Sequence, residues 1–180
     1  MQGRKRCLFT LVLLVLAMPF AAQSTSEPSA DAGPGMPAGG PSSVVLWQPG
    51  DPGERLFLRG RVIDSGGRPV PGATVALRQA DGTGQYQEVR YRATFQTAKD
   101  GTFSISTVLP GQYWGPKHIH MMVRHGDGPP LVTRILFKGD PHLDDARDGD
   151  FAILLEEVHK DGEKILVGGV ELVIPGTVSN

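Results

Sequence analysis

The sequence predicts an all-β fold, an antiparallel β-sandwich, from three features. Short segments rich in β-branched and other apolar residues recur from Val44 onward. Turn signals of the Asp-Gly and Gly-Gly type separate them, and no segment keeps a helical hydrophobic period over three turns. Glycine (24 residues) and proline (15) are abundant, which suits a chain of many short strands and turns. This pattern is typical of antiparallel sandwiches.

Nine segments have the composition expected of strands. In chain order they are residues 44–47, 56–63, 74–79, 89–97, 103–107, 119–123, 132–137, 152–158 and 164–174. The clearest turns between them are residues 65–67, 81–82, 99–101 and 160–162, where glycine and aspartate favour tight reversals of the chain. The regular succession of strand and turn leaves no room for a long helix.

The first residues read as a targeting segment. Residues 4–6 are basic, and residues 7–20 form an apolar run that is shorter than the roughly 20 residues of a membrane span. We therefore predict a signal peptide over residues 1–22 and a secreted or periplasmic protein, with an uncleaved anchor as the alternative. The only cysteine, Cys7, lies in this segment, so no disulfide is expected in the exported protein.

After the signal peptide we expect a flexible linker and then one domain. Residues 23–43 are rich in Ser, Ala, Gly and Pro, which is typical of a linker, and residues 44–180 suffice for one β-sandwich. The net charge is −1 and the pI is about 6.5, so no nucleic acid is expected as a partner. No membrane is expected as a partner after signal cleavage, and the sequence does not predict an oligomeric state.

Two tyrosines and two histidines form the most informative motif. Tyr86 follows a glycine-rich turn, Tyr113 follows Pro-Gly, and His118 and His120 are two residues apart. Residues i and i+2 of a strand point to the same face, so both imidazoles can reach one metal ion. Two phenolates and two imidazoles suit Fe(III) better than zinc or copper, because hard cations favour anionic oxygen ligands.

The chain resembles the intradiol ring-cleavage dioxygenases, the family of catechol and protocatechuate dioxygenases, over residues 59–141. The segments that carry the resemblance are residues 60–64, 67–73, 79–86, 100–103, 107–113, 116–120 and 131–141. It implies a β-sandwich of the intradiol dioxygenase or prealbumin-like type that binds Fe(III) through Tyr86, Tyr113, His118 and His120. It also implies that Tyr86 and His120 stay bound throughout turnover, while Tyr113 detaches when catechol binds. Tyr91 lacks the flanking residues of the family motif.

The resemblance also implies the reaction. A catechol would bind the iron through both oxygens, and the Tyr113 phenolate would accept one of its protons. With O2, the ring would open between the two hydroxyl-bearing carbons to a muconate-type diacid, without an organic cofactor. Two alternatives stay open. Residues 60–73 fit a noncatalytic binding module of the transthyretin or carboxypeptidase-associated type equally well, and a family member can bind iron without turnover.

The chain departs from the family pattern beside the first histidine. Gly115 stands where the family has an arginine, and only residues 114–117 separate Tyr113 from His118. Lys117 and Arg134 are the candidates for the missing positive charge, which would stabilise negative charge on the substrate ring. The short loop predicts an open site, in which Trp114 either stacks on an aromatic substrate or packs within its own loop. The remaining histidines are expected at the surface or in turns: His125, His142 and His159.

Overall fold

The computed structural model describes residues 42–149 and 152–176. In chain order the elements are β1 (Ser43–Val45), β2 (Arg55–Asp64), β3 (Thr74–Gln79), β4 (Arg92–Gln96), β5 (Thr102–Val108), β6 (His118–Arg124), β7 (Leu131–Phe137), α1 (Asp145–Asp148), β8 (Ala152–Ile153), β9 (Leu155–Lys160) and β10 (Glu163–Ile174). The predicted signal peptide and nearly all of the predicted linker lie outside the described residues. Among the described residues, no helix combines the length and apolarity needed to span a bilayer.

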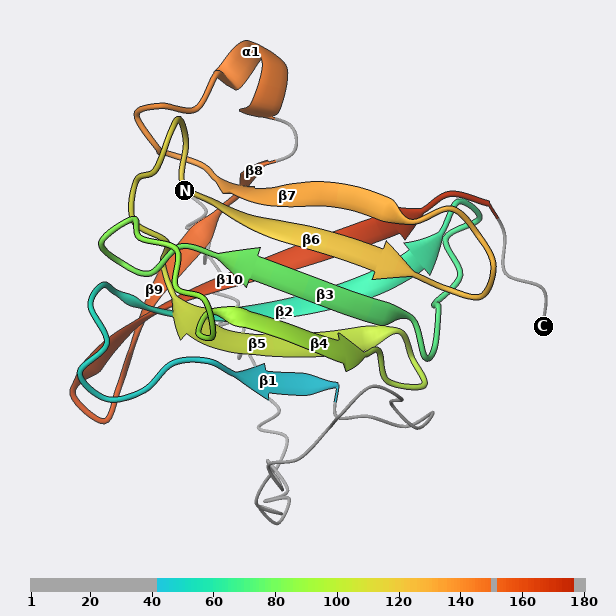
Figure 1. Ribbon diagram of the computed structural model, residues 1–180, viewed down its shortest axis with the longest axis horizontal. Coiled ribbons are helices and arrows are strands. Elements are labelled where there is room, and N and C mark those ends of the chain that lie inside the picture. The colour runs from blue at the N-terminus through green and yellow to red at the C-terminus, as the bar shows by residue number, and fades with distance from the viewer. Residues whose placement is uncertain (1–41, 150–151, 177–180) are drawn as a thin grey trace, which may run out of the picture. The chain divides into compact units, whose positions relative to one another are not determined.

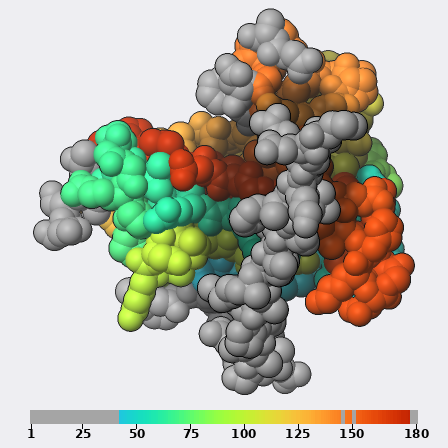
Figure 2. All heavy atoms as spheres, turned by 180° about the vertical axis from the view of Figure 1, so that it is seen from behind, coloured from blue at the N-terminus to red at the C-terminus, as the bar shows by residue number. Residues whose placement is uncertain are grey.

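The strands form two five-stranded sheets that face each other. One sheet has the order β1-β5-β2-β10-β9, and the other has the order β4-β3-β6-β7-β8. In Figure 1 the ribbons of β3 and β6 pass in front of those of β2 and β10. Figure 2 shows the opposite side, where the orange-red hairpin of β9 and β10 lies at one end. The predicted β-sandwich is confirmed.

Both sheets are mixed rather than antiparallel throughout, because three strand pairs are parallel: β1 with β5, β2 with β10, and β7 with β8. The β2–β10 ladder is the longest in the fold, running from the pair Arg55–Ile165 to the pair Asp64–Ile174. Its strands come from opposite ends of the domain sequence. Turn signals report on chain neighbours only, so a parallel pair of this kind leaves no local trace.

Two predicted strands also differ from the structure. The segment predicted at 89–97 begins only at Arg92, because Tyr91 has a φ of 55°, outside extended backbone. The segment predicted at 152–158 is divided into β8 and β9, which pair in different sheets. Short α1 lies just before β8, in a stretch for which no helix was predicted.

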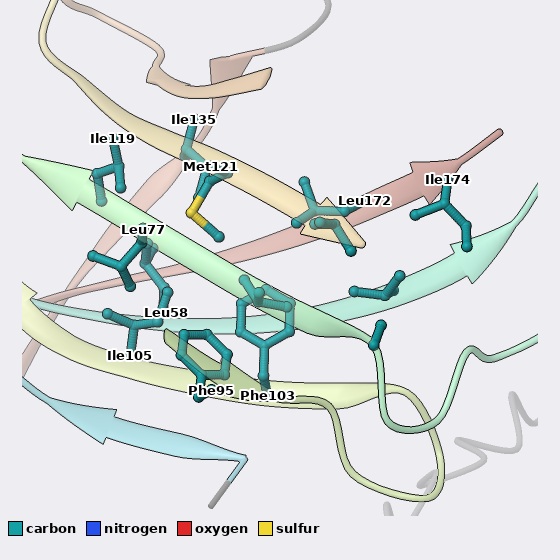
Figure 3. Packing of buried hydrophobic residues seen from close by; sticks show 14 of the residues in the cluster. Leu58, Leu77, Phe95, Phe103, Ile105, Ile119, Met121, Ile135, Leu172 and Ile174 are labelled. Carbon is teal, nitrogen blue, oxygen red and sulfur yellow. The ribbon is translucent and has the colours of Figure 1, made fainter. Parts of the chain in front are cut away.

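The core lies between the sheets and is built by strand alternation. Every second residue of β6, for example Ile119 and Met121, is buried against side chains of the facing sheet such as Leu58 and Leu172. Figure 3 shows these apolar side chains in the space between the two sheets. Because side chains alternate across a strand, the other residues of β6 must point away from the core.

Candidate metal centre

The two histidines lie on the outer face of β6, where strand alternation places them. Their neighbours Ile119 and Met121 are buried in the core. The Nε2 atoms of His118 and His120 are 3.1 Å apart. Bonds from a metal ion to imidazole are about 2.1 Å long, so two such ligands at right angles hold their nitrogens about 3 Å apart. His118 Nδ1 lies 2.8 Å from the carbonyl oxygen of Pro116, which requires the proton on Nδ1 and leaves the Nε2 lone pair free.

The two tyrosines reach the same place from loops. Tyr86 lies in the connection between β3 and β4, and Tyr113 lies in the connection between β5 and β6. Their ring centroids are 5.2 Å apart in an edge-to-face arrangement, and the Tyr86 ring centroid is 6.3 Å from that of His120. The structure therefore brings Tyr86, Tyr113, His118 and His120 together, as the sequence predicts.

Glycines allow the two tyrosine loops to touch through their backbones. A Cβ atom on Gly111 would lie 2.2 Å from the backbone nitrogen of Gly84. A Cβ atom on Gly84 would lie 2.3 Å from the carbonyl oxygen of Gln112, and Gly84 also has a φ of 86°. Side chains at these positions would separate the loops. The distance between the two phenols thus depends on glycine at both contact points.

A buried polar network holds the same loops on the sandwich. The buried Gln79 side chain donates from Nε2 to the carbonyl oxygen of Val108, 2.9 Å away, which ties the end of β3 to the end of β5. The Gly111 nitrogen donates to the carbonyl oxygen of Asp81 over 2.7 Å. The Asp81 carboxylate accepts four hydrogen bonds, from Thr83 N, Thr83 Oγ1, Gln85 N and Gln87 Nε2. Asp81 therefore organises the turn that carries Tyr86.

Because of this network, the stability of the fold decreases at acid pH. Burial alone would raise the pKa of Asp81, but the hydrogen bonds from Thr83, Gln87 and Gln85 outweigh it and lower the pKa to about 2. The carboxylate form therefore stabilises the fold fully above its unfolded pKa of 3.8, and this contribution is lost as the pH falls toward 2. We expect Asp81→Asn to lose roughly 1–2 kcal/mol near neutral pH and progressively less below pH 4, in urea unfolding followed across pH.

Asp127→Asn, in the exposed turn after β6, is the matched control and should keep the wild-type pH profile. An Asp81→Asn protein with the same unfolding free energy as wild type at pH 7 would contradict this role of Asp81.

The phenol of Tyr86 requires a cation to ionise near neutral pH. Burial raises the pKa of Tyr86, the nearby Arg78 charge opposes this rise, and Tyr113 adds to it. The Arg78 guanidinium carbon lies 4.8 Å from the centroid of the Tyr86 ring. A bound metal ion holds a phenol as phenolate, so the ionised form is expected only in the metal complex.

The imidazole of His120 is held in the form that binds metals. Burial lowers its pKa, and the positive charges of His118, Arg134 and Arg78 lower it further. Neutral imidazole is the form that coordinates a metal ion. The donor set of two phenols and two imidazoles, with the two Nε2 atoms 3.1 Å apart, fits one Fe(III) ion.

The four side chains line one open pocket of about 420 Å³. Its lining residues are Arg78, Tyr86, Tyr113, Trp114, His118 and His120. Arg134 and Lys117 are the two basic residues that the sequence suggested for this site. Arg134 lines an adjoining hollow together with His120, whereas Lys117 lines neither that hollow nor the pocket. Trp114 is 89% exposed and Gly115 has open space around it, so the loop does not cover the pocket. The loop-packed alternative for Trp114 is wrong.

Sequence reasoning missed three residues of the site. Arg78 enters the pocket from β3, Asp81 organises the Tyr86 turn, and Asp140 accepts a hydrogen bond of 2.8 Å from the backbone nitrogen of Lys117. Asp140 thereby anchors the residue before His118.

The sequence signal that could have revealed Asp81 was its place before Gly82 in a turn. Arg78 gave no signal, because only the pairing of β3 with β6 places it opposite His120. The other histidines lie at the surface or in turns, as predicted, although His142 Nε2 lies 2.6 Å from Gln112 Nε2.

Known dioxygenases resemble the chain in sequence. A family model described as Dioxygenase matches residues 40–114, a range that includes both tyrosines. The beta chain of protocatechuate 3,4-dioxygenase from Burkholderia cepacia is 35% identical over 117 residues, covering 52% of this chain and 49% of the relative. Catechol 1,2-dioxygenase from Acinetobacter baylyi is 30% identical over 178 residues, covering 77% of this chain and 56% of the relative.

Solved structures of dioxygenases resemble the chain in fold. Catechol 1,2-dioxygenase from Pseudomonas arvilla C-1 superposes with a TM-score of 0.68 at 27% identity, covering 82% of this chain and 61% of that chain. The dioxygenase domain of a dioxygenase carbohydrate-binding protein fusion from Streptomyces sp. SirexAA-E gives 0.62 at 27% identity, covering 82% of this chain and 97% of that chain. The chain spans about half the length of the curated relatives it matches.

Proposed function

Because the chain belongs to the intradiol ring-cleavage dioxygenase family, we propose that it is an Fe(III)-dependent dioxygenase acting on a catechol-type aromatic. With O2, it would open the ring between the two hydroxyl-bearing carbons to give a muconate-type diacid. One observation carries the proposal. Two phenols and two imidazoles converge in one open pocket, with the imidazole Nε2 atoms 3.1 Å apart.

In this proposal Tyr86, Tyr113, His118 and His120 hold the ferric ion. When bound, Fe(III) supplies a Lewis acid and a template that orients the substrate. Neighbouring groups favour the forms of His118 and His120 that bind a metal ion. The Pro116 carbonyl selects the His118 tautomer, and the lowered pKa of His120 favours its neutral ring. Tyr86 is half-buried between Arg78 and Tyr113, which favours a ligand that stays in place.

Tyr113 is the residue placed to move a proton. Tyr113 is 45% exposed, and it lies in the pocket wall within the loop between β5 and β6 rather than on a strand. Its phenolate Oη can therefore turn away from the pocket without disturbing the core. We assign to Tyr113 Oη the acceptance of one proton from the catechol hydroxyls, the work of a general base that is already in position.

Arg78 supplies the positive charge that is missing at position 115, where this chain has glycine in place of the family's arginine. It lines the pocket beside both tyrosines, whereas the glycine leaves open space. Negative charge that develops on the substrate ring is stabilised by a cation placed in advance. The open loop also leaves room for a ring substituent.

The test is to purify the protein with ferric iron supplied, and to measure iron content, the visible spectrum, oxygen uptake and the ring-opened product with catechol. We expect about one iron per chain, a red phenolate-to-iron charge-transfer band that shifts with catechol, and equal consumption of catechol and O2. A colourless, iron-free protein would overturn the proposal in favour of a binding module. A red protein without oxygen uptake would leave an iron-binding member that lacks turnover.

A further inference from the structure

Arginines flank His120 across the outer face of the second sheet. In the strand register Arg78 of β3 stands opposite His120 on one side, and Arg134 of β7 stands opposite it on the other. Arg92 of β4 stands opposite Arg78 in turn. Neighbouring strands lie about 4.8 Å apart, so the four residues form one row across the sheet. Figure 1 shows β4, β3, β6 and β7 side by side in this order.

The arginines of this row, Arg78, Arg92 and Arg134, form no direct ion pair with a carboxylate in the part of the chain that the structure describes. Asp148 lines the same hollow as Arg134 and attracts it, but the ion pair of its carboxylate is with Arg147, at 2.9 Å. Like charges on neighbouring strands repel each other, so the row gains stability when an anion binds to it.

The row also borders three hollows that share His120 in their walls. They are the metal pocket of about 420 Å³ and two others of about 430 and 450 Å³. Arg78 lines the first and second, and Arg134 lines the third. Exposed Val132 lines the second and third. A trough with apolar walls and guanidinium groups therefore continues from the metal pocket along the outer face of the sheet.

We propose that Arg78 and Arg134 form an anion subsite on either side of His120, and that the substrate is a catechol whose ring carries an anionic arm reaching along this trough. The inference rests on the proposed function, because it assumes that the catechol end occupies the metal pocket. Guanidinium groups bind carboxylates through paired, charge-assisted hydrogen bonds, which makes a carboxylate the matching group. The open space beyond Gly115 and the exposed Trp114 leave the arm free to extend.

The test compares 3,4-dihydroxycinnamate with its methyl ester, two ligands of nearly equal shape that differ in charge. Binding is measured without oxygen by the shift of the charge-transfer band, so turnover does not enter. We expect the acid to bind wild-type protein about tenfold more tightly than the ester, and this preference to weaken at high salt. Arg78→Gln and Arg134→Gln should each reduce the preference to about threefold or less. The ester serves as an internal reference for metal loading in each variant.

Arg124→Gln is the control, because Arg124 lies on the same face of β6 but four residues beyond His120. It should keep the full preference for the acid. Equal binding of acid and ester by wild type, or an equal loss in Arg124→Gln, would overturn the subsite while leaving the dioxygenase proposal intact. An iron-free preparation would overturn the dioxygenase proposal instead. Binding of the acid and of the ester is then measured by the fluorescence of Trp114, with Trp114→Phe as the reference. The subsite proposal fails if acid and ester again bind alike.

Discussion

Tyr86→Phe should abolish stable binding of ferric iron while leaving the fold intact. The substitution removes one oxygen atom and keeps the ring, which packs 5.2 Å from the Tyr113 ring and beneath the Arg78 guanidinium. Fe(III) depends on anionic oxygen ligands, and Tyr86 is one of two phenols in the pocket. Loss of a residue that only supports a ligand lowers metal affinity about 10–100-fold, so loss of a ligand should cost more than about 100-fold.

The experiment measures iron content after dialysis, the charge-transfer band and the unfolding free energy, with Tyr91→Phe as control. Tyr91 is the third tyrosine of the chain, and it is buried away from the pocket. Burial and the neighbouring Asp51 carboxylate raise the pKa of Tyr91 to about 12, which disfavours a phenolate there. We expect Tyr91→Phe to keep its iron and its colour. If instead Tyr86→Phe stayed red and Tyr91→Phe lost its iron, the ligand assignment would be wrong.

The strand part of the site was predictable because alternation is a local property. Ile119 and Met121 belong in the core, so His118 and His120 must share the outer face of β6. The two-residue spacing alone predicts convergent imidazoles, and the structure adds the Pro116 carbonyl that selects the tautomer.

The parts that sequence reasoning missed depend on pairing between distant segments. Arg78 enters the site because β3 pairs with β6 in a register that sets it opposite His120. The parallel pairing of β2 with β10 joins the beginning and the end of the domain. Neither register follows from turn residues or hydrophobic period, which describe only chain neighbours. Tyr91 shows the same limit, because its positive φ delays the start of a segment whose composition is that of a strand.

Gly111→Ala should damage both the fold and the metal centre. The added Cβ would lie 2.2 Å from the Gly84 nitrogen and 2.6 Å from the Gly82 carbonyl oxygen, and both atoms belong to backbone that cannot rotate aside. The two loops must therefore separate, which also strains the 2.7 Å hydrogen bond from Gly111 to Asp81. Overpacking of this kind costs about 1–3 kcal/mol, and we expect a loss near 3 kcal/mol because no side chain can yield.

Separation of the loops would also move Tyr113 away from Tyr86, whose packing requires their present contact. Iron content should therefore fall even under conditions in which Gly111→Ala remains folded, and the charge-transfer band should weaken. Gly169→Ala is the matched control, because a Cβ there meets nothing within 4 Å and the residue is exposed on β10. It should match wild type in unfolding free energy and in iron content. If Gly111→Ala lost stability but bound iron like wild type, the loop contact would serve the fold alone, and the spacing of the two phenols would not depend on it.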